Sequence, residues 1–484
     1  MACHHRGGRF VRQRTARRCP PCCRGAGCNR ALQEIDLRPH HARHGRCRSL
    51  PGPLARLAGP AGRVAAQRRR PERPAGRGDG ARRARAMIGV AYAKHSDPAA
   101  AVRACAVALG SGRPQLLLAF CGGKHDPGAL RAALRDVFGP APVYGGSAAG
   151  CIGRGGFGYS GFELGLVAFH DPGTTPEVVV TRGLLEDERA AGAAMGREVS
   201  GIAGPGDVVL LLFDSVAVAA PLRLHPASSI VAGFHAGFGD RPVCLLGGGL
   251  LTDMNLSGGW VFDGDEVVKH AAVALVFPPC IRAETAVMHG CRPVSTFMEI
   301  TRIDGAEVYE LDGKPALSVI ERMLGLPLGG ARGQELTLVA TLGEKQGDPY
   351  APFDENAYVN RLILHANPET GSVTLFEKDF ARGTRVQIMS RDNGLMLDSV
   401  RRGVAEVNRA IARTRPLLGL YIDCAGRGSS RSGAPVEEAE LVRRTLDPAV
   451  PLLGFYSGVE IAPFAAGRSR PLDWTGVLTV LRRA

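Results

Sequence analysis

Residues 116–120 read Leu-Leu-Leu-Ala-Phe, and residues 142–147 read Pro-Val-Tyr-Gly-Gly-Ser. The first run is short and apolar, as a buried strand requires, and the second is a strand that ends in glycines. Apolar residues at helical spacing within 129–137 predict a helix between them. Because a helix-length crossover normally joins parallel neighbours, we expect these two strands to be parallel. A Gly-rich turn then leads to a third strand at 162–169.

The same succession of elements occurs twice more along the chain, which indicates an internal repeat. The second copy has its strands at 208–213, 242–249 and 272–277, and the third has its strands at 417–422, 450–458 and 476–481. Further strands are expected between these copies, at 335–340, 358–365, 373–376 and 384–389. The pattern predicts an α/β to α+β fold, with two linked α/β domains at 87–305 and 306–484 built from a repeated strand-crossover-strand-strand unit.

The net charge of +14 is unevenly distributed. Residues 1–86 contain 22 Arg and no Lys against four acids, which leaves 87–484 slightly acidic. A segment rich in Arg, Pro and Gly with few bulky apolar residues cannot offset its chain entropy, so we expect a disordered leader. We favour Met87 as the true start, because a strand of normal composition follows it. The rest of the chain does not support a basic groove for nucleic acid.

The cellular location follows from apolar runs and cysteines. No apolar run after Met87 reaches the 18 residues that a membrane helix needs. Seven cysteines are scattered through 87–484 without a pairing pattern, which is typical of small buried side chains in a reducing compartment. We therefore expect a cytoplasmic protein with no membrane partner.

The glycine-ended strands mark a candidate ligand pocket. Ligands of open parallel sheets bind beyond the carboxyl ends of the strands. Glycine there permits positive φ angles and lets backbone N–H groups approach a ligand closely, although it also simply permits tight turns. The candidate ligand-binding residues lie at or near these strand ends: Gly146, Ser147, Gly247, Gly248, Cys424, Arg427, Tyr456 and Glu460.

Two of these residues have alternative interpretations. Arg427 could pair with a ligand carboxylate, with Glu460 holding an ammonium group, or it could form a structural ion pair with Glu460 or Glu437. Cys424 follows a buried strand, and Arg427 could lower its thiol pKa enough for nucleophilic chemistry. A small buried cysteine that closes a strand is the interpretation we prefer.

Other motifs give weaker indications. Residues 153–158 satisfy GxGxxG, but they precede a strand instead of opening a helix, so a dinucleotide site is not expected. Ser147 lies in a segment that only partly resembles GxSxG, and no His and acid follow in triad order. Eight His follow Met87, and none pair at metal-ligand spacing. One of them could still be an axial haem ligand, which needs no motif.

Segments from three parts of the chain carry a resemblance to a known family. Residues 144–150, Tyr-Gly-Gly-Ser-Ala-Ala-Gly, resemble the G-C-S-T-A-G-E segment of the FIST N-terminal domain. Residues 288–293 and 309–317, which end in Glu-Leu-Asp-Gly-Lys-Pro-Ala-Leu, are similar to that family's inter-domain signature. Residues 424–427 and 454–463, with the acids Glu437 and Glu438, resemble the FIST C-terminal domain. The resemblance covers essentially all of 87–484.

The chain departs from the family pattern at several positions. Ala149 and Cys151 replace more polar residues, Val459 fills a position that is usually Gly, and Asp473-Trp474 replaces His-Asn. If these positions line the pocket, the ligand preference differs from that of the family.

The resemblance implies a sensory protein for a small ligand, an amino acid or a derivative, and not an enzyme. It implies a signalling partner such as a histidine kinase or a cyclic-dinucleotide enzyme. No output domain follows the third repeat, so we expect the signal to pass by contact with that partner. Similarity to haem-binding members leaves a nitric-oxide sensor as an alternative, and an enzyme that uses Cys424 is a second alternative.

Overall fold

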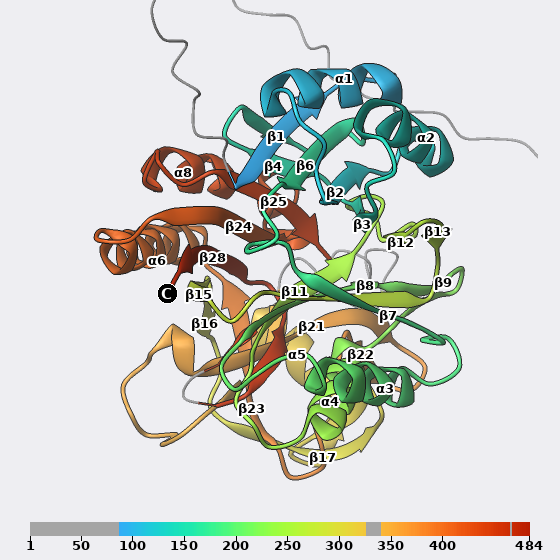
Figure 1. The fold of residues 1–484 in the computed structure, drawn as a ribbon. Helices are drawn as coiled ribbons and strands as arrows, with labels where there is room; N and C mark the ends of the chain where they lie inside the picture. The colour runs from blue at the N-terminus through green and yellow to red at the C-terminus, as the bar shows by residue number, and fades with distance from the viewer. Residues whose placement is uncertain (1–86, 326–339, 465–466) are drawn as a thin grey trace, which may run out of the picture. The chain divides into compact units, whose positions relative to one another are not determined.

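The computed structural model describes residues 87–325, 340–464 and 467–484 (Figure 1). The expected disorder of the leader 1–86 and nearly all of the expected strand 335–340 lie outside these residues. Within the described part, strands and helices mix in sheets that contain both parallel and antiparallel pairs. The predicted α/β to α+β class is therefore confirmed.

The first repeat begins with an outer strand and a helix that the predicted repeat unit did not include. Its elements are β1 (Ile88–Lys94), α1 (Pro98–Leu109), β2 (Leu116–Gly122), α2 (Pro127–Phe138), β3 (Val143–Ala148), β4 (Cys151–Gly153), β5 (Gly156–Gly158) and β6 (Glu163–Phe169). The two helices start in the same way, with an Asp side chain that accepts backbone N–H groups and a Pro in the first turn. This local chemistry fixes where each crossover helix begins.

The second repeat follows the same order and adds a small hairpin of β9 and β10. Its elements are β7 (Glu177–Arg182), α3 (Glu188–Ser200), β8 (Val208–Asp214), β9 (Val216–Ala219), β10 (Leu222–Leu224), α4 (Ala227–Phe238), β11 (Cys244–Leu250), β12 (Val261–Gly264), β13 (Val267–Val268) and β14 (Ala271–Val276).

The third repeat is interrupted after its outer strand. Its elements are β15 (Ile281–Met288), α6 (Asn393–Ile411), β24 (Pro416–Cys424), a 3-10 turn (Ala425–Arg427), α7 (Ser429–Ser432), α8 (Glu438–Thr445), β25 (Leu452–Ser457), β26 (Glu460–Pro463), β27 (Ser469–Leu472) and β28 (Gly476–Arg483).

The predicted strand pairing is confirmed in all three repeats. The first and second strands of each unit are parallel, as β2 with β3, β8 with β11 and β24 with β25. The third strand is antiparallel to the first, and the outer strand pairs with the third. Apolar runs buried on both faces make this possible, because one face of each sheet packs on its own helices and the other faces a shared core.

The three repeats exchange hairpins in a closed cycle, which the sequence did not reveal. The strand that follows each glycine-ended strand pairs in another repeat: β12 of the second repeat with β3, β26 of the third with β11, and β4 of the first with β25. The registers match, since Val261 faces Gly146, Glu460 faces Gly248 and Cys151 faces Phe455. Each sheet is therefore completed by a segment from a different repeat.

One glycine in each repeat is fixed by this close strand packing. A Cβ atom on Gly145, Gly247 or Gly454 would lie 2.2, 1.8 or 2.3 Å from the carbonyl oxygen of the neighbouring parallel strand. No side chain fits at such a distance. These glycines thus have a packing role that is independent of any ligand.

A strand-rich segment is inserted between β15 and α6. Its elements are β16 (Cys291–Pro293), β17 (Met298–Asp304), β18 (Glu307–Leu311), β19 (Lys314–Pro315), α5 (Ala316–Leu324), β20 (Ala340–Lys345), a 3-10 turn (Glu355–Ala357), β21 (Tyr358–Asn367), β22 (Ser372–Leu375) and β23 (Arg385–Arg391). Strands β17, β18, β22, β21, β20 and β23 form a closed antiparallel ring, because β23 pairs with both β17 and β20. The inserted segment has its own core.

Strands from both sides of residue 306 pair within the same sheets, as the hairpin exchange requires. The division into domains at 87–305 and 306–484 stays a prediction. Among the described residues, every helix is too short or too polar to span a bilayer.

Candidate functional site

A pocket of about 330 Å³ opens where β24 and β25 end. One wall comes from the end of β24 and the turn after it (Cys424, Ala425 and Gly426) and from the end of β25 and the residue after it (Ser457 and Gly458). A second wall is the loop after β11 together with β10, and a third is the inserted segment through β21 and the residue after β22. Two repeats and the insertion thus meet at one cavity, at the carboxyl ends of parallel strands as expected.

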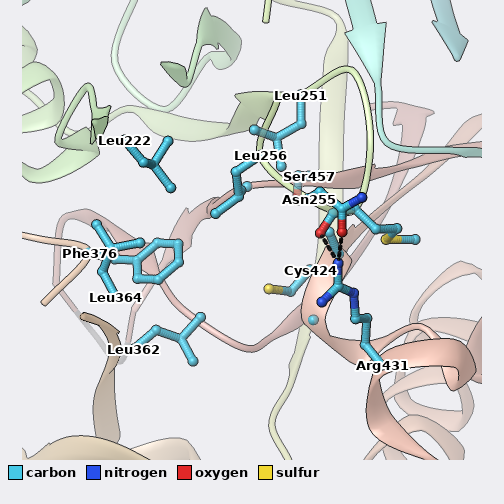
Figure 2. A pocket seen from close by; sticks show the side chains of 14 residues that line it. Leu222, Leu251, Asn255, Leu256, Leu362, Leu364, Phe376, Cys424, Arg431 and Ser457 are labelled. Carbon is cyan, nitrogen blue, oxygen red and sulfur yellow. Dashed lines mark hydrogen bonds between the residues drawn. The ribbon is translucent and has the colours of Figure 1, made fainter. Parts of the chain in front are cut away.

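The side chains that line the pocket are mostly apolar. Figure 2 shows leucines and Phe376 around one side of the space and Arg431 with Asn255 on the opposite side. The apolar lining side chains are Leu222, Leu251, Met254, Leu256, Leu362, Leu364 and Phe376. Such a lining with few polar groups is typical of small-molecule sites.

Arg431 is the cationic side chain of the lining. It belongs to the short helix α7, and its Nη2 group donates to the Met254 carbonyl at 2.8 Å and to the Asn255 side-chain oxygen. Both acceptors are neutral. Within the described part of the chain, no carboxylate lies within ion-pair distance of this guanidinium, so its charge is not balanced locally.

Of the eight residues proposed from the sequence, Cys424 lines the pocket directly. Tyr456 and Glu460 flank the lining residues Ser457 and Gly458 along the chain. The Ser457 hydroxyl donates to Glu460 Oε1 at 2.6 Å, and Thr475 donates to Glu460 Oε2 through its hydroxyl (2.9 Å) and its backbone N–H (3.2 Å). Glu460 therefore lies behind the pocket wall, and burial raises its pKa to about 8.

Arg427 is buried on the other face of the β24 end and is fully engaged. Its guanidinium holds Glu438 through two hydrogen bonds, of 2.9 and 2.6 Å. It also donates to the carbonyls of His289 at 3.0 Å and Trp474 at 2.9 Å. The structural ion pair that we considered from sequence is present, but its partner is Glu438 instead of Glu460 or Glu437. Arg427 has no contact with the pocket lining among its hydrogen bonds.

The acids beside Arg427 outnumber it. Tyr421 donates to Glu438 at 2.7 Å, and Tyr456 donates to Glu437 at 2.7 Å. Asp423 is buried with both carboxylate oxygens lacking a hydrogen bond, although Oδ1 lies 3.4 Å from Arg427 Nε. Burial and the neighbouring Glu438 raise the pKa of Asp423 well above its usual value.

Burial disfavours the thiolate form of Cys424, which is the form that acts as a nucleophile. Burial raises its pKa well above the usual range, and the charge of Glu460 adds to this effect. The lowering of the thiol pKa by Arg427 that we considered is wrong, since that guanidinium is paired with Glu438.

The remaining proposed residues lie within the sheets. Ser147 donates to the Trp260 carbonyl and accepts from the Trp260 N–H, at 3.4 and 3.2 Å, so its hydroxyl joins β3 to the segment before β12. Gly146 pairs with Val261, Gly247 with Ile461 and Gly248 with Glu460. These four residues are buried, and none of them lines the pocket.

Sequence reasoning missed Arg431 and the apolar walls. Arg431 lies four residues after Arg427, beyond a 3-10 turn whose direction no motif reveals. Leu362 and Leu364 alternate on one strand, and this period of two was a usable indication of a shared face. Leu362 and Leu364 lie near the end of β24 only in the folded chain, and no local sequence pattern indicates this contact.

One pocket wall is fastened to the second repeat. Phe376 lines the pocket, and the next residue, Glu377, accepts the N–H groups of Ala227 and Ser228 at the start of α4, at 3.2 and 2.7 Å. Lys378 N–H donates in return to the Ser228 hydroxyl at 3.2 Å. A carboxylate at a helix N-terminus satisfies otherwise unpaired donors, so this contact ties the insertion to α4.

Metal binding has no support in the described part of the chain, where no three His, Cys, Asp or Glu side chains are placed to hold an ion. No histidine is among the residues that line the 330 Å³ pocket. The haem alternative stays a prediction.

Comparison with known proteins places this architecture in a family. Residues 115–314 match the FIST N domain, and residues 316–463 match the FIST C domain. An uncharacterized protein of Mycobacterium bovis is 29% identical over 231 residues, 47% of this chain and 58% of the relative. An uncharacterized protein of Methanocaldococcus jannaschii is 25% identical over 202 residues, 39% of this chain and 36% of the relative.

The match thus spans little more than half the length of the mycobacterial relative. The two family matches cover most of the described residues, in the order expected from the sequence. This chain belongs to the FIST family and carries a FIST N domain followed by a FIST C domain.

Proposed function

We propose that this protein is a small-ligand receptor whose binding site is the pocket at the ends of β24 and β25. The observation that carries the proposal is the unbalanced charge of Arg431 among mostly apolar side chains in a cavity of about 330 Å³. FIST domains are associated with sensory and signal-transduction roles, which fits a binding pocket. The ligand is an amino acid or a derivative, with its carboxylate at Arg431 in the place first assigned to Arg427.

The receptor acts in the cytoplasm through a partner, such as a histidine kinase or a cyclic-dinucleotide enzyme. The contact of Glu377 with α4 supports a route for the signal. A ligand in the pocket contacts Phe376, and the next residue, Glu377, is hydrogen-bonded to the first residues of α4. A ligand that favours one position of this segment shifts the population of the form that the partner recognises.

Thermal unfolding of the full chain against a panel of amino acids and their derivatives tests the proposal. A ligand at a hundred times its Kd adds about 2.7 kcal/mol of stability, which raises Tm by about 2–4 °C for a protein of this size. Leu364 is a half-buried lining residue on β21, so Leu364→Trp fills the pocket and should abolish the shift. A shift that survives in this variant, or no shift with any compound, contradicts the proposed site.

A further inference from the structure

The chemistry of the pocket narrows the class of ligand that it can accept. Arg431 is one of two longer polar side chains in the lining, and the other, Asn255, already accepts a hydrogen bond from it. The guanidinium carries five N–H donors, and its bonds to Met254 and Asn255 both use Nη2. The donors on Nε and Nη1 therefore have no partner among the described residues, and a carboxylate is the group that fits a guanidinium best.

A cationic group finds no counterpart in the same space. None of the fourteen described residues that line the pocket is Asp or Glu. The Ser457 hydroxyl donates to Glu460, which lies behind the wall. An ammonium group in the pocket would be repelled by the charge of Arg431, and no carboxylate among the lining residues would offset this repulsion.

One carboxylate, Glu377, does lie beside an adjoining cavity that shares Leu256, Phe376 and Gly458 with the pocket. That cavity measures about 10 Å³, which is room for a single water molecule at most. The two oxygens of Glu377 already accept the first N–H groups of α4. Glu377 is therefore not available to an ammonium group.

The apolar walls determine the size and chemistry of the rest of the ligand, which we call its body. Leu222, Leu362, Leu364 and Phe376 lie across the space from Arg431 and Asn255 (Figure 2). Leu251, Met254 and Leu256 complete the apolar lining. A volume of about 330 Å³ lies at the lower end of the range for small-molecule sites, so the body is a single aromatic ring or a short branched chain.

We infer that the pocket selects an apolar carboxylate without a free ammonium group, such as a deaminated or N-acylated derivative of an apolar amino acid. This inference rests on the proposed receptor function and assigns its ligand class. Arg431 binds the carboxylate, and the apolar walls bind the body.

A matched series of probes tests the inference by calorimetric titration of the full chain. The four probes share a phenyl ring on a short chain: 3-phenylpropanoate has the carboxylate, phenylalanine has both charges, 2-phenylethylamine has the ammonium, and 3-phenylpropan-1-ol has neither. We expect 3-phenylpropanoate to bind at least tenfold more tightly than phenylalanine, and 2-phenylethylamine to bind most weakly.

Arg431→Gln is the variant that isolates the guanidinium, and Arg409→Gln on the exposed face of α6 is its matched control. R431Q should weaken 3-phenylpropanoate about tenfold to a hundredfold, so that it binds no better than the alcohol, whereas R409Q should leave all four affinities unchanged.

The outcomes separate the two claims. Phenylalanine binding as tightly as 3-phenylpropanoate, with loss of both in Leu364→Trp, overturns the ligand class and leaves the receptor function standing. If R431Q lowers the affinities for 3-phenylpropan-1-ol and 3-phenylpropanoate equally, the ligand class is also overturned. No binding of any probe, alongside a thermal shift from another compound in the panel, overturns the ligand class alone. Binding of the probes that survives in Leu364→Trp contradicts the pocket itself.

Discussion

Arg427 and Arg431 lie four residues apart and have opposite environments. Arg427 is buried against Glu438 on one face of the β24 end, with four hydrogen bonds to protein groups. Arg431 borders the pocket on the other side, with two neutral acceptors. The charge of Arg427 is paired with Glu438 inside the protein. The charge of Arg431 has no carboxylate partner among the described residues and is available to a ligand. An arginine near a strand end is thus a binding residue only where its charge remains unpaired.

The largest loss of stability should come from breaking the ion pair between Arg427 and Glu438. Arg427→Met leaves Glu438 buried without its cation, and we expect a loss of about 3–5 kcal/mol in the free energy of unfolding. Urea denaturation at neutral pH measures this loss. The double variant Arg427→Met, Glu438→Gln removes the stranded charge of Glu438 and should recover part of the lost stability. A loss below 1 kcal/mol in the single variant would show that Arg427 does not stabilise the buried acids.

An intermediate effect is expected at Glu460, behind the pocket wall. Burial raises its pKa to about 8 from the ordinary 4.5, so the fold favours the protonated form. This contribution is complete below pH 4.5 and is lost as pH rises through 8. Glu460→Gln cannot ionise, and its amide can donate to the Ser457 hydroxyl.

We therefore expect E460Q to gain about 2–4 kcal/mol relative to the natural chain between pH 5 and pH 8.5, measured by urea denaturation at both values. The comparison is made within each pH, because Glu377 and Asp473, whose pKa values burial also raises, add the same trend in both proteins. A stability difference that does not change with pH contradicts a protonated Glu460.

The smallest effect should come from Arg431 in the absence of ligand. Arg431→Gln breaks two hydrogen bonds to neutral acceptors at a half-exposed site, so the free energy of unfolding should fall by less than about 1 kcal/mol. The same denaturation experiment measures it. A loss as large as that of Arg427→Met would erase the contrast between the two residues and assign Arg431 a structural role.

The sequence was sufficient for the repeat and for its parallel strands. Runs such as Leu116–Gly122 and Val208–Asp214 are buried on both faces, so composition alone identifies them. It was not sufficient for the hairpin exchange, because β4 has three residues and its partner β25 lies about 300 residues away. Arg427 was placed at a strand end correctly, but which face it occupies depends on α8 and Glu438, which pack there only in the folded chain.

Because of the hairpin exchange, some strands are synthesised long before the strands with which they pair. The ribosome adds residue 452, where β25 begins, about 300 residues after residue 151, which at 5–20 residues per second corresponds to about 15–60 s. Throughout that interval the first repeat carries a hairpin whose partner does not yet exist, and the edge of β11 likewise waits for β26. Until the last strands of the chain emerge, these strand edges lack their partners, and unpaired strand edges are prone to pair with other chains.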